Sequence, residues 1–341
     1  MKIQRTKSIY ILILSMLAVF AAGCGSQDAA ISKSITIYSG RSESLVGPLL
    51  EQFENSSGMK VQVRYGSTAE LAATILEEGE NSPADIFFAQ DPGGLGAVAN
   101  AGLLAPLADN IVSGVEPRFV DADNRWVGVS GRARVVVYNT DSLSPEDLPD
   151  DLMGFMDPKW KGRIGLPPTN SSFQTMVTAL RQAWGEEQTR AWLLGIIANQ
   201  PVYYESNTPT VAAVAAGEIE VGFVNHYYLY RFLAEEGESF AARNYFLPGG
   251  GPGSLVMVSG VGRLKSSTKQ DYADQFIEFL LSDYAQQYFA EQTFEYPLIQ
   301  GIPPFVDLVP LAELNTYEIS LEDLSDLQGT VQLLQDVGML P

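Results

Sequence analysis

Segments with strand-like alternation are separated by segments with helical spacing along most of this 341-residue chain. In the first hundred residues the predicted elements are 35–38 (strand), 45–56 (helix), 60–65 (strand), 68–80 (helix) and 84–88 (strand). A loop is expected at residues 90–94, before a further helix. Because strands joined through helices run parallel, this order predicts an α/β fold.

The same alternation continues through the rest of the chain. Predicted strands cover residues 134–138, 163–166, 219–224 and 255–261, and predicted helices cover 173–184, 186–197, 210–216, 227–236, 272–281 and 284–291. We predict two α/β lobes, with chain crossings near residues 128–136 and 247–255. The N-terminal lobe is expected to comprise 35–132 and 255–300, and the C-terminal lobe 133–254 and 301–341. Ligands of such sheets bind beyond the carboxyl ends of the strands, which predicts a cleft that closes by hinge motion.

The first 23 residues have the layout of a secretory signal that ends at the only cysteine. A basic start is followed by an apolar run at 9–20 and by small residues at 21–23, directly before Cys24. We interpret residues 1–23 as a lipoprotein signal peptide, Cys24 as the lipidation site and 24–34 as a linker. The protein is then exported and lipid-anchored to the membrane, periplasmic or on the outer face of the cell membrane. An ordinary signal peptide with an incidental cysteine is the alternative.

The charged residues and the rare residue types exclude several classes of function. With 41 acidic against 21 basic residues, the net charge is −20, which disfavours a nucleic-acid partner. Loss of residues 1–23 removes three positive charges and brings the net charge to −23. One cysteine excludes an intramolecular disulfide, and one histidine excludes a His-rich zinc or copper site. We expect a monomer with a strongly acidic soluble body.

Two adjacent tyrosines, Tyr227 and Tyr228, follow a predicted buried strand and open a helix. At such a turn both side chains can face one ligand. Phenolate is a hard, anionic oxygen donor, and only a strongly charged cation would deprotonate two phenols of pKa ~10 at neutral pH. The pair is therefore a candidate site for a trivalent metal ion. The alternative is a pair of packing residues whose hydroxyls contact water.

Hydroxyl and amide side chains lie at two predicted helix starts. Asn170-Ser171-Ser172 ends a strand and opens one helix, and Asn207 opens another. The free N–H groups of a helix start attract anions. Arg41, at the end of the first strand, and Arg132, at the first crossing, add guanidinium groups for the same anion. Plain helix capping is the alternative for the Asn and Ser side chains.

Together with several other segments, these residues resemble the ferric-iron-binding proteins of bacterial ABC importers, in the periplasmic-binding-protein superfamily. The segments are Ile35-Thr36-Ile37-Tyr38-Ser39-Gly40, Pro83-Ala84-Asp85-Ile86-Phe87-Phe88, Ala101-Gly102-Leu103-Leu104-Ala105-Pro106, Ser130-Gly131-Arg132-Ala133-Arg134-Val135, Pro158-Lys159-Trp160-Lys161 and Glu295-Tyr296-Pro297-Leu298. The resemblance spans nearly the whole mature chain. It implies a two-lobed fold in which each lobe is a mixed sheet flanked by helices, with the ligand cleft between the lobes.

The resemblance also implies a ligand set. In that family two adjacent tyrosines bind Fe³⁺, and they match Tyr227 and Tyr228. A synergistic anion, carbonate or phosphate, completes the coordination in many members. The segments that cradle this anion match Asn170-Ser171-Ser172, Asn207 and Asn225. The implied partner is an ABC transporter permease.

The sequence departs from the best-known family pattern in the N-terminal lobe. Some members place a histidine ligand after the first strand, where this chain has Ser42, between Arg41 and Glu43. Where they place a glutamate ligand, this chain has Gln90, followed by Asp91. We therefore expect few or no direct ligands from this lobe, with Arg41 on the anion and water or a chelator in the open positions. Ser42, Glu43, Gln90 and Asp91 are additional cleft candidates.

The leading hypothesis is a lipid-anchored receptor that captures Fe³⁺ with an anion and delivers it to a permease. One alternative keeps the fold but binds a small organic solute such as a polyamine, thiamine or a phosphonate. An exported enzyme is less favoured, because the chain has no Gly-x-Ser-x-Gly, HExxH or Walker motif. Its one histidine, His226, is expected to point away from the tyrosine pair.

Overall fold

The computed structural model describes residues 33–305 and 307–341, and Ser34–Pro341 forms one compact unit. The predicted signal peptide, Cys24 and the predicted linker up to residue 32 lie outside the described residues. Within the described ranges, no helix combines the length and apolar character needed to cross a membrane.

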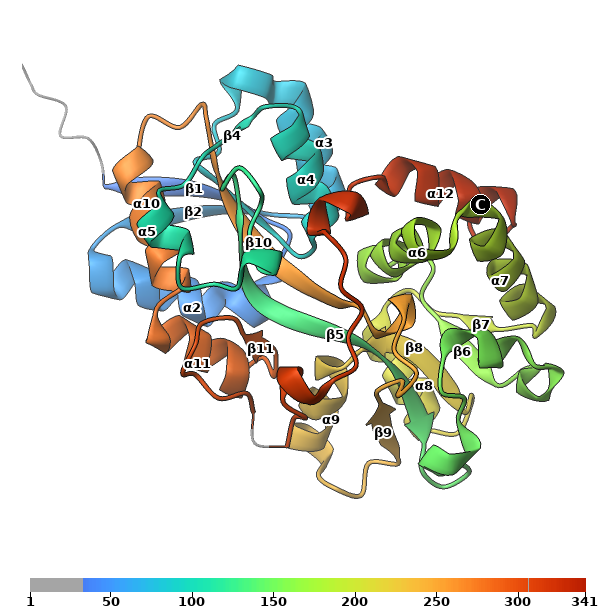
Figure 1. Cartoon of the computed structure of the whole chain (residues 1–341). Helices are drawn as coiled ribbons and strands as arrows, with labels where there is room; N and C mark the ends of the chain where they lie inside the picture. The colour runs from blue at the N-terminus through green and yellow to red at the C-terminus, as the bar shows by residue number, and fades with distance from the viewer. Residues whose placement is uncertain (1–32, 306) are drawn as a thin grey trace, which may run out of the picture. The chain divides into compact units, whose positions relative to one another are not determined.

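Strands and helices alternate along this unit (Figure 1). The strands are β1 (Ser34–Ser39), β2 (Lys60–Tyr65), β3 (Ile86–Ala89), β4 (Leu104–Ala105), β5 (Val127–Asn139), β6 (Ile164–Leu166), β7 (Val202–Tyr203), β8 (Val221–Asn225), β9 (Ala242–Tyr245), β10 (Val256–Leu264) and β11 (Tyr296–Pro297). The helices are α2 (Glu43–Ser57), α3 (Thr68–Glu78), α4 (Pro92–Asn100), α5 (Asp109–Val112), α6 (Ser171–Trp184), α7 (Glu186–Ala198), α8 (Asn207–Ala215), α9 (Tyr227–Glu236), α10 (Gln270–Leu280), α11 (Asp283–Glu291) and α12 (Leu327–Asp336).

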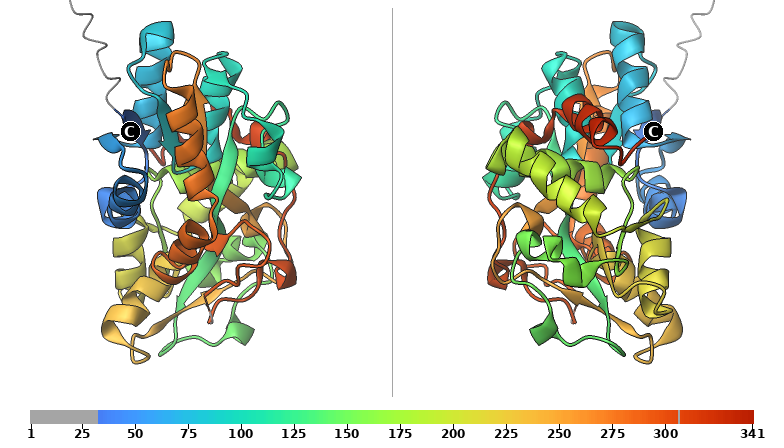
Figure 2. Two further views of the ribbon diagram at one scale, coloured as in Figure 1. Left: turned by 90° about the vertical axis from the view of Figure 1, so that its left-hand side faces the viewer. Right: turned by 90° about the vertical axis from the view of Figure 1, so that its right-hand side faces the viewer.

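One long strand, β5, joins two halves of a mixed sheet whose order is β2-β1-β3-β10-β5-β8-β6-β7. In the first half β1 runs parallel to β2 and β3, while β10 runs antiparallel to both β3 and β5. In the second half β8 is antiparallel to β5 and parallel to β6. The pairing partner of β5 changes from β10 to β8 between Ala133 and Arg134. Figure 2 shows β5 continuing from one half into the other in both side views.

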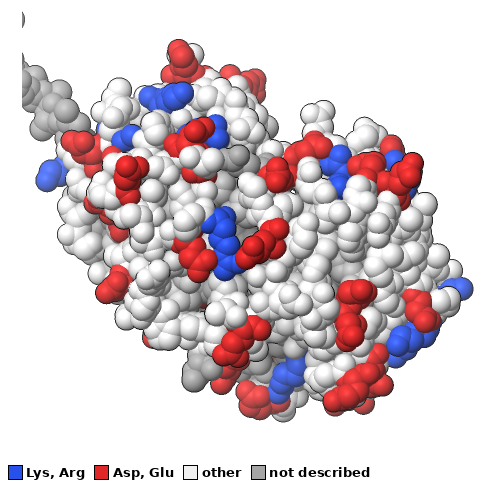
Figure 3. All heavy atoms as spheres, in the orientation of Figure 1, with Lys and Arg blue, Asp and Glu red and all other residues white. Residues whose placement is uncertain are grey.

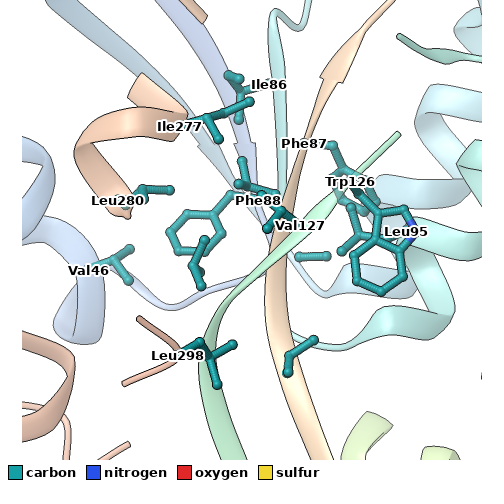
Figure 4. Close-up of a cluster of buried hydrophobic side chains, with 14 of the residues drawn as sticks. Val46, Ile86, Phe87, Phe88, Leu95, Trp126, Val127, Ile277, Leu280 and Leu298 are labelled. Carbon is teal, nitrogen blue, oxygen red and sulfur yellow. The ribbon is translucent and has the colours of Figure 1, made fainter. Parts of the chain in front are cut away.

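Each half of the sheet has its own apolar core. In the first half, β3 places Phe88 toward Val46 and Leu280 on one side, and Phe87 toward Trp126 on the other (Figure 4). In the second half, alternate residues of β5 face opposite sides of the sheet. Val136 and Tyr138 belong to one core cluster, and Val135 and Val137 to another. Arg132 and Arg134 have the same parity as Val136, so they share one face of β5.

The structure corrects several predicted boundaries. The predicted loop 90–94 is wrong from Pro92 onward, because α4 begins there with proline in its first turn. The predicted strand 134–138 is only the second part of β5. The first part was missed because its residues do not alternate between apolar and polar, although the structure buries all of them. The helices predicted at 173–184 and 210–216 begin earlier, at Ser171 and Asn207.

The last residues of the chain contact both halves. The 3-10 helix η8 (Leu321–Leu324) packs on α4 and also contacts α6, and Leu321 and Leu324 belong to the core of the first half. The following helix α12 packs on α6, and its Leu333 and Leu334 belong to a core of the second half. Figure 1 shows this red segment passing from beside α4 to beside α6.

Candidate metal centre

Tyr227 and Tyr228 open α9 one residue after the end of β8. Their rings stack, with centroids 4.2 Å apart. Tyr227 is fully buried, whereas Tyr228 is half-buried. Within the part of the chain that the structure describes, the Tyr227 hydroxyl has no hydrogen-bond partner. Burial, together with the neighbouring Tyr228, raises the pKa of Tyr227 well above its ordinary value. A buried phenol without a partner is unfavourable, so this group is suited to bind something else.

His226 lies between β8 and the tyrosines, and its ring meets that of Tyr227 edge to face, with centroids 5.9 Å apart. Its Nδ1 accepts a hydrogen bond from the backbone N–H of Ala133 at 3.0 Å. Its Nε2 therefore carries the proton, which it donates to the carbonyl of Phe294 at 2.8 Å. Burial lowers the pKa of His226 to about 4, so the ring is neutral at physiological pH. With both nitrogens engaged, His226 positions the start of α9 and is not available as a metal ligand.

Three buried arginines surround the tyrosine pair. Arg41 follows β1, and Arg132 and Arg134 lie on one face of β5. Arg41 donates from Nη2 to Glu295 at 2.5 Å, but no described residue accepts from its Nε and Nη1. Arg134 donates from Nη1 to Asn225 at 3.0 Å and leaves Nε and Nη2 without a partner in the same described ranges. Burial and the neighbouring Arg132 lower the pKa of Arg134 to about 9. These donors are suited to an anion.

Five of the seven predicted anion-binding residues form one hydrogen-bonded network, whereas Arg41 bonds to Glu295 and Ser171 lies beside Asp91. Asn170 caps α6 by accepting from the Ser172 N–H at 3.1 Å, and it also accepts from Asn207 Nδ2 at 3.1 Å. Asn207 accepts from the Asn225 N–H at 3.2 Å, and Asn225 Nδ2 donates to Ser172 Oγ at 3.1 Å. Arg132 Nη1 donates to the same Ser172 Oγ at 3.3 Å. The Asn170 side chain therefore caps a helix, and the network aligns Ser172 and Asn225 beside the arginines.

The candidates from the first half of the sheet differ in their positions. Asp91 is buried at the start of α4, and its Oδ2 has no hydrogen-bond partner in the described chain. Burial raises the pKa of Asp91, against the opposing effects of Arg132 and Ser171, its neighbour from the other half. Gln90 contributes its backbone carbonyl, which accepts from Arg132 Nη2. Ser42 and Glu43 are exposed, and the described contacts do not connect them with the tyrosines.

Two residues of this cluster are absent from the predicted site. Arg134 had a usable signal, because it lies two residues after Arg132 in a strand and must share its face. Glu295 begins one of the segments that carry the resemblance, but no spacing relates it to its partner Arg41, which is 254 positions away. Both side chains are buried, and together with Arg41, Arg132 and Asp91 they form a charged cluster inside the protein.

The candidate metal ligands are tyrosines rather than a cluster of carboxylates or histidines. Residues 33–305 and 307–341 contain no group of three or more His, Cys, Asp or Glu side chains placed to hold a metal ion. On the face shown in Figure 3, acidic side chains are scattered, several of them beside basic ones. Hard oxygen donors in a buried, cation-rich setting fit a small, highly charged metal ion that arrives with an anion.

Residues 81–314 match the family model described as bacterial extracellular solute-binding protein. The Fe(3+)-binding periplasmic protein of Serratia marcescens is 33% identical over 342 residues, covering 100% of this chain and 99% of its own length.

Solved structures of iron-binding proteins are also similar to this chain. Iron-bound HitA from Pseudomonas aeruginosa superposes with a TM-score of 0.85 at 35% identity, covering 89% of this chain and 99% of its own. A Trichodesmium protein in complex with iron and citrate gives 0.78 at 28% identity, again covering 89% and 99%. These neighbours confirm the predicted two-lobed α/β fold and the predicted resemblance. The chain belongs to the bacterial extracellular solute-binding proteins.

Proposed function

We propose that this protein is a lipid-anchored, extracytoplasmic receptor that captures Fe³⁺ with a synergistic anion and delivers it to an ABC permease. The observation that carries the proposal is the fully buried Tyr227 hydroxyl, which has no partner in the described chain although it stacks on Tyr228 beside Arg41. Two phenolates offset two of the three charges of Fe³⁺, and the arginines attract the anion. The names of the relatives, which specify Fe(3+) for the Serratia protein and iron for HitA, support the same cargo.

The anion is assigned to the region between the arginines and the α6 start. Ser172 and Asn225 are held there by the amide network, and Arg41 and Arg134 retain free donors in the described chain. Carbonate and phosphate are the expected anions, and citrate is a third, since the Trichodesmium structure contains it. Three buried guanidinium groups disfavour the cationic alternatives, polyamine and thiamine.

The lobes are proposed to meet at the change of partner in β5, with residues 35–132 and 255–300 in one and 133–254 and 301–341 in the other. Arg132 and Arg134 lie on either side of this change. Closing the lobes over the cargo then brings Asp91 and Arg41 of one lobe against Ser171 and Tyr227 of the other. A ligand bound by both lobes favours the closed state.

Tyrosinate-to-iron charge transfer tests the cargo. Chelator-stripped protein given Fe³⁺ and hydrogen carbonate should develop a visible absorption band, and the double variant Tyr227→Phe/Tyr228→Phe should not. Tyr230→Phe is the matched control, because this tyrosine lies on the same helix and its hydroxyl is used on the carbonyl of Asp307. A wild-type protein that stays colourless with every anion supplied would refute the iron assignment.

Fractionation tests the anchor. Cys24→Ser should move the expressed protein from the membrane fraction to the soluble exported fraction without changing its iron colour. An unchanged distribution would favour the ordinary signal peptide. Size-exclusion chromatography of the soluble form tests the expected monomer.

A further inference from the structure

Glu295 is a fully buried carboxylate that contacts two of the three arginines. Its Oε2 accepts from Arg41 Nη2 at 2.5 Å and from Thr293 Oγ1 at 2.9 Å. Its Oε1 lies 3.8 Å from Arg132 Nε and has no hydrogen bond in the described chain. A fully buried carboxylate stays ionised only when neighbouring positive charges compensate for the loss of water.

The backbone around Glu295 belongs to the support of the tyrosines. The carbonyl of Phe294 accepts a hydrogen bond from His226 Nε2, and Tyr296 pairs with Gly131 of β5. The N–H of Glu295 donates to the carbonyl of Phe289 at 2.9 Å. The carboxylate is therefore fixed relative to both the start of α9 and Arg132.

Glu295 determines how Arg41 is presented. It engages one end of the guanidinium, so Nε and Nη1, for which the described residues offer no acceptor, remain for a ligand. Tyr227 and Tyr228 lie near enough for their charge to stabilise the Arg41 cation once they ionise. Arg41 is thus held between a permanent carboxylate and the candidate phenolates.

The charges of the cluster limit the anion that fits. With Asp91 and Glu295 both ionised, the guanidinium groups of Arg41, Arg132 and Arg134 exceed these two carboxylates by one positive charge. Fe³⁺ with two phenolates adds one more, so an anion of charge −2 balances the filled site. Without the charge of Glu295, the balance would require −3. Each uncompensated charge in a buried site is costly.

We propose that Glu295 is a specificity-determining positioning residue, which holds Arg41 and makes the site prefer a dianion over a trianion. This inference rests on the proposed function and adds the charge class of the anion and the residue that sets it. Carbonate and hydrogen phosphate belong to the preferred class, and fully ionised citrate does not.

Anion titrations test it. Chelator-stripped wild type, Glu295→Gln and Glu295→Asp receive Fe³⁺ with increasing hydrogen carbonate or citrate, and the half-saturating concentration of each anion is taken from the visible band. Because citrate also binds iron in solution, the quantity compared is the carbonate-to-citrate ratio of each variant relative to wild type. Glu295→Gln should shift this ratio at least tenfold toward citrate, and Glu295→Asp, which keeps the charge, should restore the wild-type preference.

The test needs a matched control. Glu291, an exposed carboxylate on α11, supplies the control. Glu291→Gln should leave the carbonate-to-citrate ratio unchanged. An unshifted ratio in a coloured Glu295→Gln overturns the inference and leaves the iron assignment intact, whereas a colourless wild type overturns both. If Glu295→Gln unfolds without ligand, recovery of the folded, coloured protein by iron with citrate but not with carbonate supports the inference. Recovery by neither, or equally by both, overturns it.

Discussion

Tyr227 and Tyr228 stack with their ring planes 27° apart, although they are consecutive residues of a helix. Consecutive helical side chains project about 100° apart, so the stack depends on the position of the pair in the first turn of α9. The two phenols nevertheless differ in environment. Tyr227 is fully buried and Tyr228 is half-buried beside a pocket of about 80 Å³ that Thr208 and Arg231 also line. Their replacement should therefore have different effects.

Tyr227→Phe should not destabilise the metal-free protein. Its hydroxyl is buried without a partner in the described chain, so its removal relieves an unfavourable group worth roughly 1–3 kcal/mol. Urea unfolding in the presence of a chelator should give a free energy of unfolding equal to or above that of wild type, while the iron band is lost or strongly weakened. Tyr296→Phe is the control, because its hydroxyl donates to the carbonyl of Val309 at 2.7 Å and its loss should cost about 1 kcal/mol. A Tyr227→Phe variant as destabilised as the control would mean that this hydroxyl has a partner.

Gly94→Ala should destabilise the protein and disturb Gln90. A Cβ at Gly94 would lie 2.4 Å from Thr68 Cγ2, closer than side chains pack. Thr68 would have to move, and its Oγ1 accepts the N–H of Gln90 at 2.9 Å. The expected loss is about 1–3 kcal/mol of unfolding free energy, measured by urea denaturation. Gly47→Ala is the matched control: its Cβ meets only Glu43 at 3.4 Å, and it should gain roughly 0.5–1 kcal/mol from helix propensity. Equal effects of the two changes would contradict this packing.

The alternation of strands and helices was enough to predict the fold class, because the spacing of apolar residues within each segment distinguishes a strand from a helix. The tyrosine pair could be found for a similar reason, since its two members are adjacent in the chain. Boundaries were less predictable. The predicted loop 90–94 failed because Gly93 and Gly94 suggest a loop locally, while the contacts of α4 with α3 and η8 favour a helix.

The charged interior could not be predicted in full. Arg41 and Glu295 approach only through the folded sheet, so no spacing relates them. All four N-terminal cleft candidates looked alike in the sequence. The structure shows that Ser42 and Glu43 are exposed, whereas Asp91 is buried. Such differences depend on how α2 and α4 are packed, which local pattern does not encode.

Acid should weaken the structure at Asp121. This buried carboxylate accepts from Arg125 Nε and Nη2, each at 2.7 Å. Burial alone would raise the pKa of Asp121. The hydrogen bonds from Arg125 nevertheless hold this pKa below its ordinary value. Because this pKa is lower in the folded than in the unfolded state, the ionised carboxylate stabilises the fold. The stabilisation is fully present when the pH is above the unfolded-state pKa of ~4. It is lost as the pH falls through the folded-state pKa.

Asp121→Asn should therefore cost about 2 kcal/mol at pH 7, and the difference from wild type should shrink as the pH falls below ~4. Urea unfolding across this pH range measures both. The exposed neighbour Asp123, whose Oδ2 is 3.7 Å from Arg125, supplies the control variant Asp123→Asn, which should change stability by well under 1 kcal/mol. A constant difference at all pH values would mean that the charge of Asp121 does not contribute.

The segment from η8 to α12 restricts how the two lobes separate. Tyr227 and Arg41 have no solvent exposure, so loading of the proposed iron site would require the proposed lobes to part. Only Ser325 and Asp326 connect η8 on α4 with α12 on α6, and a few residues span at most ~3.5 Å each. A wider opening must detach one end. The α12 end is held by the Thr178–Thr330 hydrogen bond at 2.7 Å and the Arg181–Asp326 ion pair at 2.9 Å, so η8 is the end expected to leave.

Two engineered disulfides distinguish the ends, both in a Cys24→Ser background. Gly96→Cys/Ser325→Cys ties Ser325, the residue directly after η8, to α4, since a Cβ at Gly96 lies 3.1 Å from that of Ser325, near disulfide range. Thr178→Cys/Thr330→Cys pins α12 to α6, where the two hydroxyls already touch. Oxidation of the first pair should slow iron loading at least tenfold relative to its own reduced form, whereas oxidation of the second should leave the rate unchanged, as followed by stopped-flow absorbance. If the second disulfide slows loading and the first does not, α12 is the end that detaches; if neither does, the lobes open with both contacts intact.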